Sequence, residues 1–221
     1  MIVDTYPGLD KSEPVLIFGD WEAHQLVLTK DKIDWLWESI SKFRTLFSDL
    51  TAGDVQNFMH YVTEPYSIWL ELRYENHPAG IVCFVNMQKV TDTDAHIVFF
   101  DRELKDKVLL CQHLLTWVFS SFPLERVSVD VPEFYFHTIR LVKNVGFRQE
   151  GVRRCGALIG GRWVNVALFG ITRQEAGKHG IPSGTPERAE PSGSTGAQEQ
   201  SATVSGPAGL RNSADRIRSV D

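Results

Sequence analysis

A strand, a helix and a second strand follow one another between residues 95 and 131, and this succession constrains the fold more than any other feature of the chain. Residues 95–100 are apolar apart from His96 and are followed by Asp101, after which apolar side chains recur at helical spacing through residues 108–122. In residues 126–131, valine alternates with polar side chains, as in a strand with one face in a core. The sequence therefore predicts a crossover unit, in which a helix connects two strands of one sheet.

Antiparallel hairpins are predicted on both sides of this crossover. Apolar and polar residues alternate over residues 67–74, turn residues occupy positions 75–78, and residues 80–87 form the returning strand. Further along, Gly160 and Gly161 make a tight turn between two apolar segments, of which the second covers residues 162–171. Helical spacing predicts helices at residues 33–50, 54–61 and 134–145, and short strands are expected at residues 15–18 and 24–28.

The segment after residue 175 differs in composition from the rest of the chain. The last aromatic side chain is Phe169, and residues 176–221 are rich in Gly, Pro and Ser, with five basic and five acidic residues. Such a segment buries too little apolar surface to offset the entropy that it would lose on ordering. We therefore expect one folded domain over residues 1–175 and a flexible tail over residues 176–221.

Composition argues against several classes of protein. The chain has 23 Lys and Arg against 28 Asp and Glu, a net charge of −5, which argues against generic nucleic-acid binding. The three cysteines are scattered and show no zinc-site spacing, so we expect no metal and a reducing cytoplasm. The N-terminus lacks the pattern of a signal peptide and no apolar stretch is long enough to cross a bilayer, so no membrane partner is expected.

Two segments near the end of the predicted domain carry a resemblance to a known family. Residues 145–154 read Val-Gly-Phe-Arg-Gln-Glu-Gly-Val-Arg-Arg, and residues 163–169 read Trp-Val-Asn-Val-Ala-Leu-Phe. Together with the order of elements, they resemble the GCN5-related N-acetyltransferase (GNAT) family over residues 21–175. The resemblance is to its ribosomal-protein-acetylating branch and to small acetyltransferase-like proteins of bacteriophages. It implies an α/β (α+β) fold whose mixed, mostly antiparallel central sheet has helices on both faces.

The implied activity is transfer of an acetyl group from acetyl-CoA directly to an amine, whose identity the sequence leaves open. Such folds hold the coenzyme pyrophosphate in the loop after the central strand, at a helix N-terminus. Against the family pattern Gln/Arg-x-x-Gly-x-Gly/Ala, Arg102 fits the first position, whereas Lys105 and Lys107 stand at the two small positions. Their ammonium groups either contact phosphate or belong to a solvated charged loop. The implied cofactor-binding residues are Val98 and Phe100 (through the main chain), Arg102, Lys105, Lys107 and His137.

Two residues are candidates for catalysis. The acceptor amine must lose a proton, and His96 lies on the strand that carries reacting groups in the family, with an ordinary pKa suited to proton transfer near neutrality. Glu71, on a neighbouring strand, would attract an ammonium substrate. The alternatives are a histidine that is merely packed on its strand and a carboxylate that lies on the surface without a function.

The helix predicted at residues 134–145 departs from the family. The family often has Asn where Phe136 stands and Tyr, the usual acid for the leaving thiolate, where Val142 stands. Tyr135 is near in sequence but is displaced by the helical angle. These departures support a second hypothesis, a catalytically degenerate structural or interaction protein with phage structural proteins as partners, in the host cytoplasm or the virion. A binder of acyl-CoA without turnover is a third.

Overall fold

The computed structural model describes residues 13–41, 43, 48–49, 53–87 and 91–178. Within them, eight strands form one sheet in the spatial order β1-β2-β3-β4-β5-β6-β8-β7. All neighbouring strands are antiparallel except β5 and β6, which are parallel, as the predicted crossover requires. The strands are β1 (Pro14–Phe18), β2 (Trp21–Gln25), β3 (Ile68–Tyr74), β4 (His77–Val85), β5 (Asp92–Phe99), β6 (Arg126–Pro132), β7 (Arg148–Ile159) and β8 (Arg162–Thr172).

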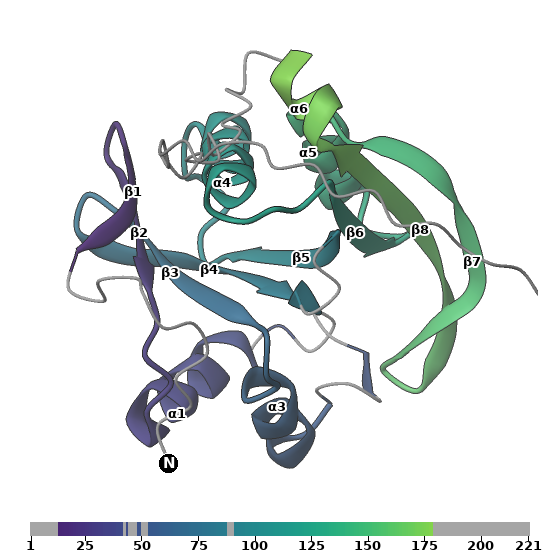
Figure 1. Ribbon diagram of the computed structural model, residues 1–221. Helices are drawn as coiled ribbons and strands as arrows, with labels where there is room; N and C mark the ends of the chain where they lie inside the picture. The colour runs from purple at the N-terminus through teal and green to yellow at the C-terminus, as the bar shows by residue number, and fades with distance from the viewer. Residues whose placement is uncertain (1–12, 42, 44–47, 50–52, 88–90, 179–221) are drawn as a thin grey trace, which may run out of the picture. The chain divides into compact units, whose positions relative to one another are not determined.

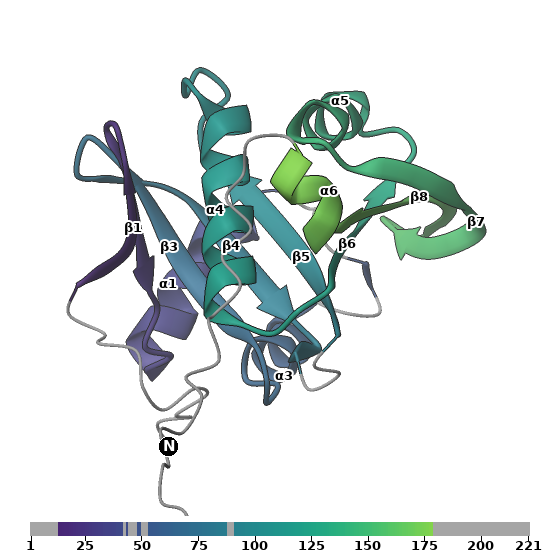
Figure 2. The same cartoon turned by 45° about the horizontal axis from the view of Figure 1, so that its top comes forward.

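Helices cover both faces of the sheet (Figures 1 and 2). One face carries α1 and α3, and each of these helices starts at a polar side chain, Thr29 or Asp54, that accepts hydrogen bonds from N–H groups of the first turn. The mixed sheet with helices on both faces confirms the predicted fold class. The helices are α1 (Lys30–Ile40) and α3 (Val55–Val62) on one face, and α4 (Lys107–Ser121), α5 (Phe136–Val145) and α6 (Arg173–Lys178) on the other.

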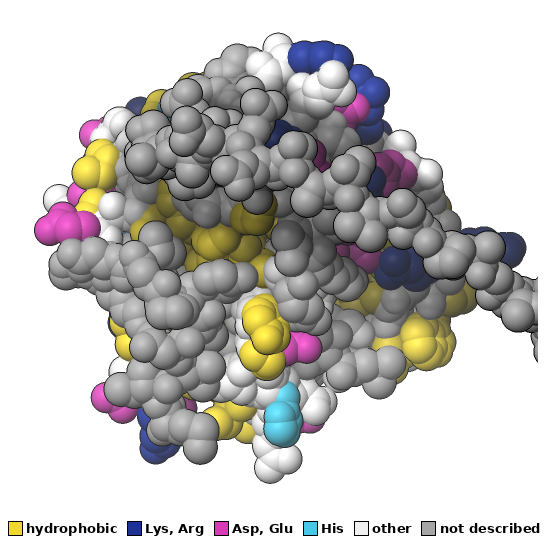
Figure 3. Space-filling view, in the orientation of Figure 1, with side chains coloured by type: hydrophobic (Ala, Val, Ile, Leu, Met, Phe, Trp, Pro, Cys, Tyr) yellow, Lys and Arg dark blue, Asp and Glu magenta, His cyan; other side chains and the backbone are white. Residues whose placement is uncertain are grey.

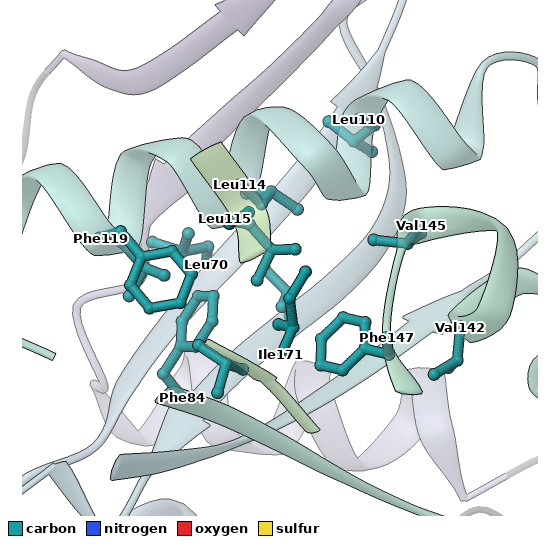
Figure 4. Close-up of a cluster of buried hydrophobic side chains, with 14 of the residues drawn as sticks. Leu70, Phe84, Leu110, Leu114, Leu115, Phe119, Val142, Val145, Phe147 and Ile171 are labelled. Carbon is teal, nitrogen blue, oxygen red and sulfur yellow. The ribbon is translucent and has the colours of Figure 1, made fainter. Parts of the chain in front are cut away.

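Strand alternation gives each face of the sheet its own apolar core. Leu70 and Leu72 of β3 belong to the larger core, beneath α4 and α5, while the intervening positions turn Trp69 toward α1 and α3. Figure 4 shows how Phe84, Phe119 and Ile171 pack together in the larger core. Full burial of one such side chain stabilises the fold by about 1.5–3 kcal/mol, so both helical layers are firmly attached.

Several boundaries differ from the sequence-based expectations. The helix expected at residues 33–50 ends at Ile40, and the strand expected at residues 24–28 lies earlier, at β2, because Leu26 and Leu28 pack against α1 instead of continuing the strand. The expected start of the tail, residue 176, falls inside α6, where Ala176 is buried. The rest of the predicted tail, residues 179–221, lies outside the described residues.

Helix α6 is attached to the end of α4 by the guanidinium group of Arg173. Arg173 donates hydrogen bonds of 2.6–2.9 Å to the carbonyl oxygens of Phe119, Phe122 and Leu124, at the end of α4. These contacts satisfy carbonyl groups that a helix C-terminus leaves unpaired. All described residues belong to one compact unit. No helix in the described part of the chain is long and apolar enough to span a membrane.

The parallel contact between β5 and β6 is short. Residues 92–94 of β5 pair with residues 126–128 of β6, and beyond this point the two strands part. On its other edge β5 remains paired with β4 as far as Phe99. The sheet therefore divides between β5 and β6, at the end of β5 that leads into the crossover helix α4.

Candidate functional site

The division between β5 and β6 opens into a cavity of about 140 Å³. Its walls are the parted strands, and its floor is formed by α4 and α5. Most of the lining is apolar, and Leu114, Leu115 and Val142 in Figure 4 belong to it. The polar side chains at its border are His96 from β5, Asp130 from β6, and Tyr135 and Thr138 at the start of α5. An elongated, largely apolar group with a polar end fits such a site.

Main-chain groups of β5 face this cavity. The N–H of Phe100 donates to the carbonyl oxygen of Ala79, in β4, at 2.9 Å. Because successive residues of a strand turn their N–H and C=O groups to opposite edges, Val98 also pairs with β4, whereas Ile97 and Phe99 turn theirs toward β6. Since β6 has parted from β5 here, the groups of Ile97 and Phe99 are those positioned for a ligand, one residue away from each of the two positions expected from the sequence.

His96 lies at the edge of the cavity with its side chain on the α1 and α3 side of the sheet. Its ring meets the ring of Tyr61 edge-on, with centroids 6.1 Å apart, and it is the β-sheet partner of Cys83. Burial lowers the pKa of His96, against the charges of Asp94 and Asp130, which raise it. The neutral imidazole is therefore favoured near pH 7 and can accept a proton.

The groups around His96 are poor nucleophiles themselves. Burial raises the pKa of the Cys83 thiol to about 12, and burial also raises the pKa of Tyr61, whose hydroxyl lies 4.0 Å from the Cys83 sulfur. On the cavity floor, burial raises the pKa of the Cys111 thiol to about 12 as well. All three groups thus remain protonated at neutral pH.

Glu71 does not join His96. Its buried carboxylate accepts hydrogen bonds from Lys32 Nζ and Arg73 Nε, both at 2.9 Å, and it lies two strands away from β5. Burial favours a raised pKa for Glu71, but the hydrogen bonds from Lys32 and Arg73 outweigh it and the pKa is lowered. The Lys32–Glu71 ion pair therefore connects the first turn of α1 to β3.

The loop between β5 and α4 is held together by one of its own lysines. Lys107 Nζ donates to the carbonyl oxygens of Asp101, at 3.1 Å, and Arg102, at 2.6 Å, and lies 5.3 Å from the centre of the Phe99 ring. Asp106, just before α4, has a φ of 56°, in the left-handed region that favours glycine. Lys107 thus orders this loop through its carbonyl groups, and the side chains of Arg102 and Lys105 stay exposed.

The first turn of α4 keeps donors for an anion. Asp106 caps this helix without a side-chain hydrogen bond, so its carboxylate does not occupy the N–H groups of the first turn. The loop also touches the core, because the indole N–H of Trp21 donates to the carbonyl oxygen of Lys105 at 3.2 Å. A phosphate group can therefore be held by the helix N-terminus with Arg102 and Lys105 beside it.

On α5, the cavity is lined by residues other than the one expected. His137 is exposed and is not among the lining residues, and Phe136 keeps 74% of its surface exposed. Tyr135, which precedes the first turn, borders the cavity, and Thr138 and Val142 follow it on the same face of the helix. Their spacing of three and four residues is the signal in the sequence that would have identified this face.

Ion pairs connect β6 with β7, and one of them includes Asp130 at the border of the cavity. Arg153 of β7 contacts Asp130 at 3.0 Å, and Arg126 of β6 forms two hydrogen bonds with Glu150 of β7. The hydrogen bonds from Arg126 lower the pKa of Glu150. In the described part of the chain, no three His, Cys, Asp or Glu side chains gather as a metal site would require.

Comparisons with known proteins agree with this architecture. No protein-family model matches the sequence. A spermidine N-acetyltransferase from Vibrio cholerae, solved with CoA and spermine, has a similar structure with a TM-score of 0.59 at 12% identity, covering 71% of this chain and 98% of that chain. A ribosomal L7/L12 alpha-N-protein acetyltransferase, solved with coenzyme A, has a TM-score of 0.57 at 11% identity, covering 72% of this chain and 98% of that chain. At these identities, the similarity is one of fold.

Proposed function

Because this chain has the fold of the GCN5-related N-acetyltransferases, we propose that it transfers an acetyl group from acetyl-CoA to an amine in one direct step. The observation that carries the proposal is the cavity between β5 and β6, which is lined by His96 and by Ile97, whose main-chain groups face the edge that β6 has left. The amine acceptor enters from the α1 and α3 side, where His96 lies. The thioester arm lies in the cavity, above α4 and α5.

The residues divide the chemistry among them. His96 takes a proton from the acceptor nitrogen, which then forms a bond to the acetyl carbon. An N–H of Ile97 or Phe99 donates to the thioester oxygen as negative charge develops there. When the carbon–sulfur bond breaks, the sulfur keeps the electron pair, and the hydroxyl of Tyr135 supplies a proton in place of the tyrosine that Val142 replaces.

The nucleotide end of the coenzyme lies at the loop before α4. The N–H groups of the first turn face its pyrophosphate, with the exposed cations of Arg102 and Lys105 beside it. Lys107 acts on the coenzyme through the loop, because its ammonium group already binds two carbonyl oxygens. Glu71 and His137 have no direct part in this arrangement.

Two measurements test the proposed function. Isothermal calorimetry with acetyl-CoA is expected to show binding at one site, and a thiol assay is expected to show CoA release when an amine is added. His96→Gln should lower turnover by about 10²–10⁴-fold while binding of acetyl-CoA persists. His77→Gln, at the exposed first residue of β4, is the matched control and should keep full activity. No heat of binding at millimolar acetyl-CoA would refute the proposal.

A second candidate function follows from the departures in the loop and in α5. Lys107 fills the loop where the family uses small residues, and Val142 provides no acid for a leaving thiolate. These two features favour an interaction module that kept the fold without turnover, as in a particle-associated phage protein. Stoichiometric recovery of the chain in purified particles, with no stabilisation by acetyl-CoA, would support this function over the enzymatic one.

A further inference from the structure

Asp94 and Asp130, whose charges both act on His96, have one cationic partner between them among the described residues. Arg126 is engaged by Glu150 and lies 3.9 Å from Asp92. Asp94 accepts a hydrogen bond from the Asn86 amide at 2.7 Å and has no cationic partner among the described residues. Asp130 pairs with Arg153, so the negative charge of Asp94 is the one left without a cationic partner. That charge attracts a cation.

The cation that now contacts Asp130 is easily replaced. The Asp130 and Arg153 side chains keep 39% and 56% of their surface exposed, and exposed ion pairs contribute little to stability. Acidic and basic side chains also lie next to each other between β6 and β7 in the space-filling view (Figure 3). A positively charged group arriving from solvent can therefore take the place of Arg153 beside Asp130 at small cost.

Asp130 and Asp94 lie on either side of His96. Asp130 borders the cavity from β6, and Asp94 precedes His96 by two residues on the same face of β5, a distance of about 7 Å along the strand. A nitrogen placed beside His96 thus has the carboxylate of Asp94 on one side and that of Asp130 on the other. A group attached to that nitrogen by a short chain reaches one of them.

We propose that Asp94 and Asp130 form a subsite for a second positive charge of the acceptor, and that Arg153 occupies this subsite until the acceptor displaces it. The proposal rests on the proposed function, because the first nitrogen is the one that receives the acetyl group. It assigns the acceptor to the short diamines. A monoamine leaves the subsite to Arg153, and the carboxylate of a zwitterionic amine meets the surplus negative charge.

Three acceptors of similar length test the subsite: putrescine, butylamine and γ-aminobutyrate. With the full chain and saturating acetyl-CoA, kcat/KM for putrescine should exceed the value for butylamine by about tenfold or more at low salt, and the ratio should fall as salt screens the charges. Asp94→Asn and Asp130→Asn should each remove most of this ratio. Asp34→Asn, at an exposed position of α1, is the matched control and should keep it.

Arg153→Gln tests the displacement itself. Removing the resident cation should lower KM for putrescine several-fold and leave KM for butylamine unchanged, an effect that a merely structural arginine would not produce. Equal kcat/KM values for putrescine and butylamine, or an unchanged KM in Arg153→Gln, would overturn the subsite.

Failure of the subsite and failure of the proposed function give different results. If acetyl-CoA raises the melting temperature and butylamine is acetylated as fast as putrescine, the subsite is refuted and the acetyltransferase stands. If acetyl-CoA does not bind, the proposed function fails, and the subsite fails with it.

Discussion

Gly80 of β4 and Val98 of β5 approach each other so closely that a β-carbon on residue 80 would stand 2.4 Å from the carbonyl oxygen of Val98. This contact fixes the edge of β5 against β4 on the side opposite the cavity. Glycine is therefore required at position 80 by the main chain of the strand that borders the site.

The substitution Gly80→Ala should disturb both stability and coenzyme binding. Because the added methyl group meets main chain, β5 must shift, and we expect a loss of about 1–3 kcal/mol in the free energy of unfolding, with weaker acetyl-CoA binding. Gly151→Ala is the matched control, since a β-carbon at 151 would meet no atom within 4 Å. Urea unfolding and calorimetry check both quantities, and equal behaviour of the two variants would contradict this role of Gly80.

The substitution Glu71→Gln separates a structural from a functional carboxylate. Loss of the charge leaves Lys32 and Arg73 with a weaker partner, but both reach solvent, so we expect the fold to lose about 1–2 kcal/mol. Turnover per folded molecule should not change, because Glu71 lies away from the cavity. Glu38→Gln, on the exposed face of α1, is the control for stability. A large fall in kcat with normal stability would restore Glu71 as a substrate-binding residue.

The substitution Lys107→Met tests how the loop before α4 is ordered. Without the ammonium group, the carbonyl oxygens of Asp101 and Arg102 lose their donor, and the loop samples other conformations. We expect acetyl-CoA to bind several-fold more weakly, measured by calorimetry. Lys105→Met is the comparison, because that side chain is exposed and its loss removes only a direct phosphate contact. Tighter binding by Lys107→Met would instead identify Lys107 as an obstacle to the coenzyme.

The low pKa of His96 should appear in the pH dependence of stability. Because the folded state holds a neutral imidazole, the unfolded chain binds more protons as the pH falls through about 6.5, and the folded state becomes less stable below that pH. Above it, His96 is neutral in both states and contributes nothing. The free energy of unfolding should thus fall less for His96→Gln than for the unchanged chain between about pH 7.5 and pH 5.5. Parallel curves in urea unfolding would show that His96 is not desolvated.

Local patterns predicted the crossover, both hairpins and the change of period at residue 67, since alternation and helical spacing are properties of neighbouring residues. Contacts between distant residues could not be predicted in this way. Asp49 accepts hydrogen bonds from the N–H groups of Gly160 and Gly161, at 3.0 and 2.8 Å, across 111 positions of sequence. The residues near Asp49 in the sequence do not indicate that Gly160 and Gly161 are its partners.

The candidate site shows the same limit. The sequence placed His96 on a strand, but its position beside the cavity depends on the parting of β5 and β6, which tertiary structure decides. Likewise, the sequence left Lys107 either as a phosphate contact or as part of a solvated charged loop, whereas its ammonium group binds carbonyl groups of its own loop. The pairing of Asp130 with Arg153 requires the order of β6, β8 and β7, which no local pattern contains.

Only three residue pairs join β5 to β6, so the main-chain hydrogen bonds of the sheet nearly stop at its middle. Strands β1 to β5 and strands β6 to β8 thus form two halves of the sheet, which are joined by these three pairs and by helix α4, which packs against the sheet. A molecule bound in the cavity between β5 and β6 contacts both halves and links them. Amide protons of β4 and β8, which belong to different halves of the sheet, should then exchange with solvent more slowly once the molecule is bound. Their exchange rates should fall together.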